Sequence, residues 1–159
     1  MRAGIGFDAH RFGADRPLVL GGVTFAGAPG LHGHSDADVV CHAICDALLG
    51  AANLGDIGTH FPDTDPAFEG ASGADLLRRV RELLAGRGYD VASVDVTLML
   101  ESPMIGAHRA EMSSNIAASL RVEADRVSVK ATTTEGMGFV GRGEGAACMA
   151  VVVVREPDD

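Results

Sequence analysis

The longest unbroken apolar stretch of the chain is residues 146–154, and it closes with four consecutive valines. β-Branched residues favour strands, because their side chains pack well on a pleated surface. Nine residues are too few to cross a bilayer as a helix, which needs about 20. Near-continuous apolar character is typical of a strand covered on both faces. The stretch therefore predicts a strand over 146–154 that is buried on both faces.

Other segments also carry strand signals. Over 94–100, valine and leucine alternate with other residues, which is the period of a strand with one buried face. Gly21-Gly22 separates two short apolar runs and predicts a tight hairpin turn. The predicted strands besides 146–154 are 2–7, 17–20, 23–25, 91–100 and 127–133.

Helical signals alternate with these strands. Ser35, with Asp38 three residues on, predicts a helix start with Ser35 as the N-cap, and apolar residues then recur at helical spacing toward Asn53. Two more helices are predicted at 75–85 and 105–120, and two loops at 27–34 and 55–72. A loop as long as the second is uncommon unless it is functional. The order of elements predicts an α/β (α+β) fold, one domain over 1–159 with a mixed sheet and helices packed on one face.

The charge balance limits the partners of the chain. Thirteen Lys and Arg stand against 22 Asp and Glu, and the net charge of −9 repels nucleic acids and anionic membranes. Aromatic residues make up 4%, too few for a base-stacking surface. An acidic chain that handles phosphates needs cations, and bound metal ions are the natural source. Three cysteines without a C-x-x-C pair predict reduced thiols in the cytoplasm, and the N-terminus lacks the pattern of a signal peptide.

Two histidines and an aspartate form a candidate metal site. Asp8 and His10 stand two residues apart in a predicted strand end, so their side chains point to the same side, and His42 lies on the first predicted helix. Two His and one carboxylate leave a fourth position open, as catalytic zinc does. Asp38 and Asp46, four residues on either side of His42, are alternative candidates for orienting its ring. The competing interpretation is that the two imidazoles lie far apart.

Three further features are less specific. His34-Ser35 occupies a predicted helix start, where backbone N–H groups favour phosphate, although Ser35 is equally explained as a cap. The segment 55–66 carries three aspartates and two prolines, which suits hydrogen bonds to sugar hydroxyls or an ordinary solvated loop. Cys41 and Cys45 are rival metal ligands, but burial as small apolar residues is the favoured role.

The C-terminal third holds one misleading motif and one suggestive motif. Gly136-x-Gly138-x-x-Gly141 matches a dinucleotide-binding fingerprint, but more glycine and a strand follow it rather than a helix, which excludes a Rossmann site. Upstream, residues 130–135 read Lys-Ala-Thr-Thr-Thr-Glu at a strand end. Hydroxyls, a lysine and a carboxylate suit phosphate oxygens, directly or through Mg²⁺; threonines at an ordinary strand edge are the alternative.

Taken together, these segments resemble one family, 2-C-methyl-D-erythritol 2,4-cyclodiphosphate synthase of the non-mevalonate isoprenoid pathway. Several separate motifs in one order are far more specific than any single motif, and the resemblance covers essentially the whole chain. The motifs are Gly6-Phe7-Asp8-Ala9-His10, His34-Ser35-Asp36-Ala37-Asp38 with His42, Gly55-Asp56-Ile57-Gly58, Phe61-Pro62-Asp63-Thr64-Asp65-Pro66, Lys130-Ala131-Thr132-Thr133-Thr134-Glu135 and Gly141-Arg142-Gly143-Glu144-Gly145.

The resemblance implies an intramolecular cyclisation. In this family the 2-phosphate of a cytidine-diphosphate-linked methylerythritol attacks the β-phosphorus and expels CMP. Asp8, His10 and His42 are then expected to hold Zn²⁺, and Glu135 to hold Mg²⁺ or Mn²⁺ with the substrate diphosphate. His34 and Thr133 are the expected catalytic residues, as donors to the charge that develops in the transition state.

The resemblance also implies a homotrimer with active sites at subunit interfaces. The methylerythritol part is expected to contact one subunit, with Asp63 the best candidate for its hydroxyls, and the cytidine and phosphates to contact a neighbour. The expected substrate-binding residues, besides the metal ligands, are His34, Ser35, Asp56, Ile57, Gly58, Phe61, Pro62, Asp63, Thr64, Asp65, Leu100, Glu101, Ser102, Pro103, Met104, Ile105, Gly106, Thr132, Thr133 and Thr134. Phe139 and Arg142 resemble residues of the central trimer cavity, where some members hold an isoprenoid diphosphate.

Two departures from the family pattern stand in these segments. Many relatives have a basic residue where Met104 stands and a proline near Ala107, so phosphate contacts from that loop are in doubt. Relatives often carry Asp-Ser where this chain has Ser72-Gly73, which predicts a more mobile substrate loop. Neither departure touches the metal ligands or Glu135.

Three functions are compatible with these residues. The cyclase is favoured over a metal-dependent phosphohydrolase, which would admit an attacking water and release an open-chain phosphate. The third is a non-catalytic trimer that binds isoprenoid diphosphates through Phe139 and Arg142. The ligand set at Asp8, His10 and His42 counts against it, because a pure binding module needs no open zinc position.

Overall fold

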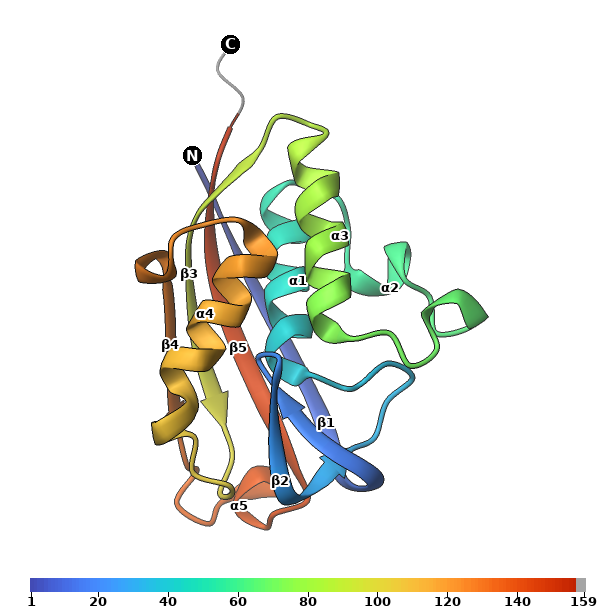
Figure 1. The fold of residues 1–159 in the computed structure, drawn as a ribbon, viewed down its shortest axis with the longest axis vertical. Helices are drawn as coiled ribbons and strands as arrows, with labels where there is room; N and C mark the ends of the chain where they lie inside the picture. Colours follow the sequence, from blue (N-terminus) through green and yellow to red (C-terminus); the bar gives the residue numbers. More distant parts are fainter. Residues whose placement is uncertain (157–159) are drawn as a thin grey trace.

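The computed structural model describes residues 1–156, whose five strands form one sheet in the order β2-β1-β5-β3-β4 (Figure 1). Strand β3 pairs with β4 in parallel and all other neighbours are antiparallel, so the sheet is mixed, as predicted. The central position of β5 fits its apolar sequence. The strands are β1 (Arg2–Leu20), β2 (Val23–Leu31), β3 (Asp90–Met99), β4 (Val127–Thr132) and β5 (Gly145–Arg155).

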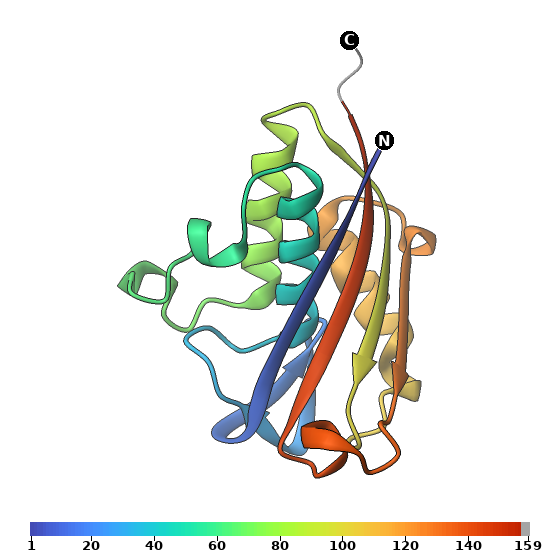
Figure 2. The same ribbon diagram turned by 180° about the vertical axis from the view of Figure 1, so that it is seen from behind.

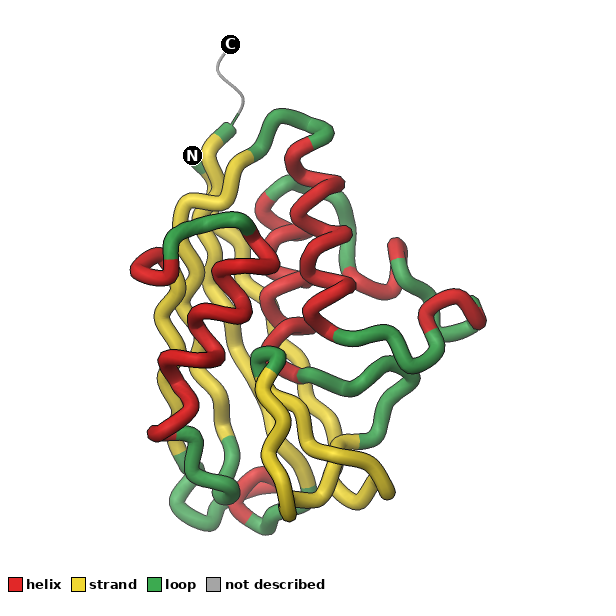
Figure 3. Tube along the Cα trace, viewed as in Figure 1, coloured by secondary structure: helices red, strands yellow, loops and turns green. Residues whose placement is uncertain are grey.

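Three long helices pack on one face of this sheet, as the sequence predicts (Figures 1 and 3). They are α1 (Val39–Ala51), α3 (Gly73–Ala85) and α4 (Arg109–Leu120). Seen from behind, the opposite face of β1, β5 and β3 carries no helix (Figure 2). The short elements are α2 (Ile57–His60), α5 (Gly138–Gly141) and the 3₁₀ turns η1 (Pro66–Phe68), η2 (Gly106–His108) and η3 (Ala124–Arg126). Within residues 1–156, no helix has the length and apolar character that a membrane span requires.

Two glycines let α1 lie directly on β1. A Cβ on Gly4 would come within 2.0 Å of the Ala47 carbonyl oxygen, and one on Gly6 within 2.0 Å of the Ala43 carbonyl oxygen. Only a residue without a side chain fits at such a distance. This contact fixes the height of α1 above the strand that carries Asp8, and together with β5 and α3 it buries nearly all of the helix.

Several predicted boundaries are wrong. Strand β2 continues to Leu31, so the predicted loop 27–34 is partly strand. The N-cap of α1 is Asp38 rather than Ser35, because the Asp38 carboxylate accepts the N–H groups of Val40 and Cys41. The loop 55–72 contains α2 and η1, each begun by an aspartate cap.

The prediction that β5 is buried on both faces is also wrong for this chain by itself. The face toward the helices is buried, but Met149 is 40% and Val151 43% exposed on the other face. Their neighbours on β1, Ile5 and Phe7, are 66% and 54% exposed. The apolar run reflects two apolar faces, and the helix layer of one chain covers only one of them.

Candidate active site

The structure brings Asp8, His10 and His42 together. Asp8 and His10 project from β1, and His42 stands in the first turns of α1, which Gly4 and Gly6 hold against that strand. Asp8 Oδ2 lies 2.9 Å from His10 Nε2 and 3.2 Å from His42 Nδ1. One ligand atom from each residue lies within 4.8 Å of the other two. Tetrahedral zinc places its ligand atoms about 3.3 Å apart, so the set has the dimensions of a zinc site.

The hydrogen bonds of His10 leave one nitrogen available. His10 Nδ1 lies 2.7 Å from the carbonyl oxygen of His32 and must donate to it, because a carbonyl only accepts. The lone pair is therefore on Nε2. That atom is buried and has no hydrogen-bond partner among residues 1–156, despite its proximity to Asp8. An orphaned, buried lone pair beside a carboxylate fits a metal ligand.

The electrostatics of the cluster favour an ionised carboxylate. Burial raises the pKa of Asp8, but the neighbouring imidazoles of His10 and His42 outweigh burial and hold the pKa well below its usual range. The Asp8 carboxylate in turn raises the pKa of His10, against the effect of burial. Asp8 is thus an anionic ligand at any physiological pH.

The residue that orients His42 is not one of the two predicted aspartates. Ser35 Oγ lies 3.0 Å from His42 Nε2, and both side chains are buried. Asp38 instead binds four backbone N–H groups, including those of Gly21 and Gly22, and Asp46 accepts the N–H of Ile57. Sequence spacing could place the aspartates on the right helix but not say which backbone groups they meet.

A cavity of about 440 Å³ opens beside the three ligands. It gathers many of the residues predicted to bind the methylerythritol part, together with the predicted catalytic His34. Asp56 and Asp65 do not line it; they cap α2 and η1. The cavity is lined by Phe7, Asp8, His10, Gly33, His34, Ser35, His42, Asp46, Ile57, Gly58, Phe61, Pro62, Asp63, Phe68 and Leu76.

A second, smaller cavity of about 200 Å³ lies between the ends of β3 and β4. It shares no lining residue with the first. It gathers Leu100, Pro103, Met104, Ile105, Gly106, Thr132 and Thr133 from the predicted nucleotide residues, with Ala131 and Arg109. Arg109 was not predicted, and only the three-dimensional proximity of α4 to β4 identifies it. In one chain, therefore, the group of candidate ligands Asp8, His10 and His42, called the metal cluster below, and the predicted nucleotide segment line separate cavities.

A hydrogen-bond network joins the two segments of the second cavity. Glu101 accepts the backbone N–H of Thr134 at 3.0 Å and lies 3.4 Å from its hydroxyl. The next residue, Glu135, has φ of 55°, an uncommon left-handed conformation for a residue with a side chain. The network fixes the backbone between Thr133 and Glu135.

The remaining candidate residues lie outside both cavities. Phe139 in α5 is 41% exposed, and Arg142 pairs with Glu144 at 2.6 Å. The glycine motif at 136–141 folds into the single turn of α5 and leads into β5, as expected of a chance match. Cys41, Cys45 and Cys148 are free and buried, and burial raises the pKa of each thiol.

A mixed sheet with one helical layer and a His₂Asp cluster beside a cavity defines an α+β protein with a candidate metal site. The family model of the YgbB family matches residues 1–155, and the chain belongs to that family. The 2-C-methyl-D-erythritol 2,4-cyclodiphosphate synthase of Symbiobacterium thermophilum is 58% identical over 154 residues, covering 97% of this chain and 98% of the relative.

Two solved structures place this similarity in three dimensions. The bifunctional IspDF of Campylobacter jejuni has a TM-score of 0.95 at 43% identity, over 99% of this chain and 42% of the longer one. The IspF–CDP complex of Plasmodium falciparum has a TM-score of 0.85 at 31% identity, over 99% and 97% of the two chains.

Proposed function

We infer that this chain converts 4-diphosphocytidyl-2-C-methyl-D-erythritol 2-phosphate to 2-C-methyl-D-erythritol 2,4-cyclodiphosphate and CMP. The observation that carries this inference is the convergence of Asp8, His10 and His42 beside a cavity, in a chain of the YgbB family. The relatives at 52–58% identity bear the name of this synthase over almost their whole length. The chain acts as one cyclodiphosphate synthase domain, and it works in the cytoplasm, where its three thiols stay reduced.

Asp8, His10 and His42 hold Zn²⁺ in this proposal. The buried lone pair of His10, the ionised Asp8 and the orienting hydroxyl of Ser35 support that assignment. Bound there, the ion neutralises charge on the β-phosphate and fixes its orientation. Glu135 would hold the second ion, Mg²⁺ or Mn²⁺, with the substrate diphosphate, and its side chain is exposed shortly after the end of β4.

The protein's part in the reaction is positioning and charge neutralisation. An oxygen of the 2-phosphate forms a bond to the β-phosphorus while the bond from that phosphorus to the CMP oxygen breaks, so no side-chain nucleophile is needed. His34 and Thr133 donate hydrogen bonds to the charge that develops on the phosphoryl oxygens. Asp63, in the cavity wall, accepts hydrogen bonds from the methylerythritol hydroxyls.

The active site in this proposal is completed by a neighbouring subunit of a homotrimer. Two features support it: the metal cluster and the nucleotide segment line separate cavities in one chain, and one face of the sheet is apolar and uncovered. Residues 100–106 and 132–135 of one subunit then face the metal cluster of another. Phe139 and Arg142, exposed in and just after α5 before β5 begins, line the trimer axis and bind an isoprenoid diphosphate.

The predicted nucleotide loop, residues 100–106, has Met104 where many relatives have a basic residue, and Arg109 takes the place of that residue in this proposal. Met104 is 83% exposed and carries no charge, but the exposed Arg109 lines the same cavity. We assign the phosphate contact of this loop to Arg109, with the cytosine read by backbone groups.

A ³¹P NMR assay with the cytidine-diphosphate methylerythritol 2-phosphate tests the function. With Zn²⁺ and Mg²⁺ we expect CMP and a cyclic diphosphate in equal amounts, and neither after EDTA treatment. His42→Ala should abolish turnover, whereas Arg87→Ala, an exposed change beyond α3, should not. An open-chain phosphate product would identify a hydrolase, and isoprenoid diphosphate binding without any turnover would identify the binding protein.

A further inference from the structure

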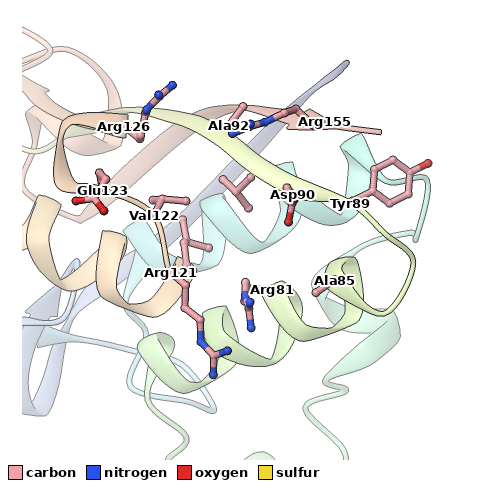
Figure 4. Close-up of a pocket in the computed structure, with 12 residues that line it drawn as sticks. Arg81, Ala85, Tyr89, Asp90, Ala92, Arg121, Val122, Glu123, Arg126 and Arg155 are labelled. Atoms are coloured by element: carbon pink, nitrogen blue, oxygen red, sulfur yellow. The ribbon is translucent and has the colours of Figure 1, made fainter. Parts of the chain in front are cut away.

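A basic cavity lies at the end of the molecule where the last turns of α3 and α4 meet the start of β3 (Figure 4). It has a volume of about 300 Å³ and shares no lining residue with the cavity beside the metal cluster. Arg81 of α3 and Arg121 after α4 line its helical side, Arg126 comes from η3, and Arg155 comes from the end of β5 (Figure 4). None of these arginines has a part in the proposed cyclisation.

The charge of this cavity is opposite to that of the chain. Four of the 13 basic residues of a chain with net charge −9 gather here, and only Asp90 and Glu123 among the lining residues are acidic. The lining therefore carries 4 − 2 = +2. Within residues 1–156, the ion pair recorded for these arginines is a loose one, Arg126 with Asp125 at 3.9 Å. The other three guanidinium groups form no ion pair with the described residues, which leaves their donors available to a ligand.

Arg121 occupies a backbone position that favours glycine. It closes α4 with φ of 55° and ψ of 47°, the left-handed conformation that usually ends a helix with Gly or Asn. The chain turns at this position, and the side chain of Arg121 lines the cavity.

The floor of the cavity is apolar. Leu120 and Val91 are 2% and 7% exposed, and Val122 is half-buried between them and the arginines. Arg81 is itself half-buried. Charged hydrogen bonds made against such a floor are less screened by water than those on an open surface.

We propose that this cavity binds the phosphate group of a small phosphorylated metabolite. Planar guanidinium forks match the oxygens of a phosphate, which accepts several charge-assisted hydrogen bonds at once. A phosphate dianion balances the lining charge of +2, whereas a monoanion leaves half of it unbalanced. The volume leaves room for a few atoms beyond the phosphate over the apolar floor.

Inorganic phosphate is the probe for this site. In the zinc-loaded protein labelled with ¹⁵N-arginine, phosphate should shift the side-chain Nε–H signals of Arg81 and Arg121 with one common dissociation constant. Arg121→Gly removes a guanidinium group but suits the left-handed backbone, so it should weaken this binding at least about tenfold without lowering the melting temperature. The matched control is Arg87→Gln, an exposed arginine beyond α3 that does not line the cavity.

Three outcomes would overturn the proposal. If the phosphate dissociation constant measured at Arg81 were the same in Arg121→Gly as in the wild type, the two arginines would not bind one phosphate together. Equal weakening by Arg87→Gln, or full competition by chloride at matched ionic strength, would reduce the effect to general screening of a basic surface. Tighter binding of succinate than of phosphate would assign the cavity to dicarboxylates. Phosphate that binds beside the metal cluster does not interfere, because the readout is the arginine side chains.

Discussion

The hydroxyl group of Ser35 orients the His42 ring in the metal cluster. Ser35 Oγ contacts His42 Nε2 at 3.0 Å, and Asp8 lies on the other ring nitrogen at 3.2 Å. If Nε2–H donates to the serine, the lone pair of Nδ1 points toward Asp8 and His10. The histidine is thus held in the tautomer and orientation of a ligand by a residue that binds no metal itself.

Removal of the Ser35 hydroxyl should weaken the binding of Zn²⁺. We expect Ser35→Ala to lower Zn²⁺ affinity by roughly tenfold, the usual effect of a lost partner behind a ligating histidine. Ser35→Thr keeps a hydroxyl and should recover most of the affinity. Competition with a fluorescent zinc chelator measures both, with the exposed Ser114→Ala as control. Wild-type affinity in Ser35→Ala would show that His42 needs no such support.

Glu101 offers a test of the nucleotide side of the site. It holds the backbone of Thr134 between Thr133 and Glu135. Glu101→Ala should raise KM by roughly tenfold, since one hydrogen bond to a charged group is worth about 1.5 kcal/mol, and should leave Zn²⁺ affinity unchanged. Glu101→Gln retains an acceptor oxygen and should lie close to wild type in steady-state kinetics. An equal rise of KM in both variants would mean that the charge of Glu101 matters rather than its hydrogen bond to Thr134.

At the level of single residues, the sequence predicts the ligands better than their supports. Asp8 and His10 share a side because strand side chains alternate, and His42 follows from the family motif. Ser35 was predicted as a helix cap and is a histidine partner, because Asp38 takes the cap. Arg109 was missed because its place in the same cavity as Thr132 depends on how the start of α4 packs against β4.

At the level of elements, the close approach of α1 to β1 sets the geometry of the site. Gly6→Ala would place a Cβ 2.0 Å from a backbone oxygen of α1, which neither element can avoid without moving. We expect the free energy of unfolding to fall by at least about 3 kcal/mol, with loss of Zn²⁺ binding as the strand shifts. Gly50→Ala is the matched control, because its Cβ meets nothing within 4 Å and alanine favours the helix. Urea denaturation measures both; a stable Gly6→Ala would refute the close packing.

Asp38 joins α1 to the β1–β2 turn. Its buried carboxylate accepts the N–H groups of Gly21, Gly22, Val40 and Cys41, and burial raises its pKa while these donors oppose the rise. Asp38→Ala leaves buried donors without an acceptor and removes the helix cap, so we expect a loss of about 3 kcal/mol. Thermal denaturation should show little change for the control Asp125→Ala, whose side chain is 83% exposed. If Asp38→Ala lowered the free energy of unfolding by less than the loss of an ordinary N-cap does, water molecules would be replacing the carboxylate as acceptor.

Helices and strands were predictable where the apolar periodicity is strong, but not where the choice of a capping residue sets the boundary of a helix. The alternation over 94–100 and the helix at 75–85 correspond to β3 and α3 within a few residues. The start of α1 was wrong because Ser35 and Asp38 are both good caps by type, and only the position of the β1–β2 turn favours Asp38. The polar, glycine-containing segment after Phe25 gave no strand signal, yet β2 extends through it by pairing with β1.

For the whole molecule, the uncovered sheet face is an apolar surface that nothing in one chain covers among the described residues. Ile5 pairs with Val151 and Phe7 with Met149 across β1 and β5, which places four exposed apolar side chains in two adjacent rows. The sequence prediction that residues 146–154 are buried on both faces fails for the isolated chain. It would hold in an assembly in which this face meets its counterparts on other subunits.

Ile5→Asp tests that assembly directly. Ile5 is 66% exposed and its partner across the strands is Val151, so a carboxylate there costs little in one chain but cannot be buried against an apolar neighbour. Light scattering after size exclusion should change from the mass of three chains to that of one, and the circular dichroism spectrum should stay the same. Turnover should fall with the assembly, because the metal cluster and the nucleotide cavity are then no longer joined. Ser114→Asp, on an exposed position of α4, should remain trimeric and active. A trimeric Ile5→Asp, or a fully active single chain, would show that each subunit builds its site alone.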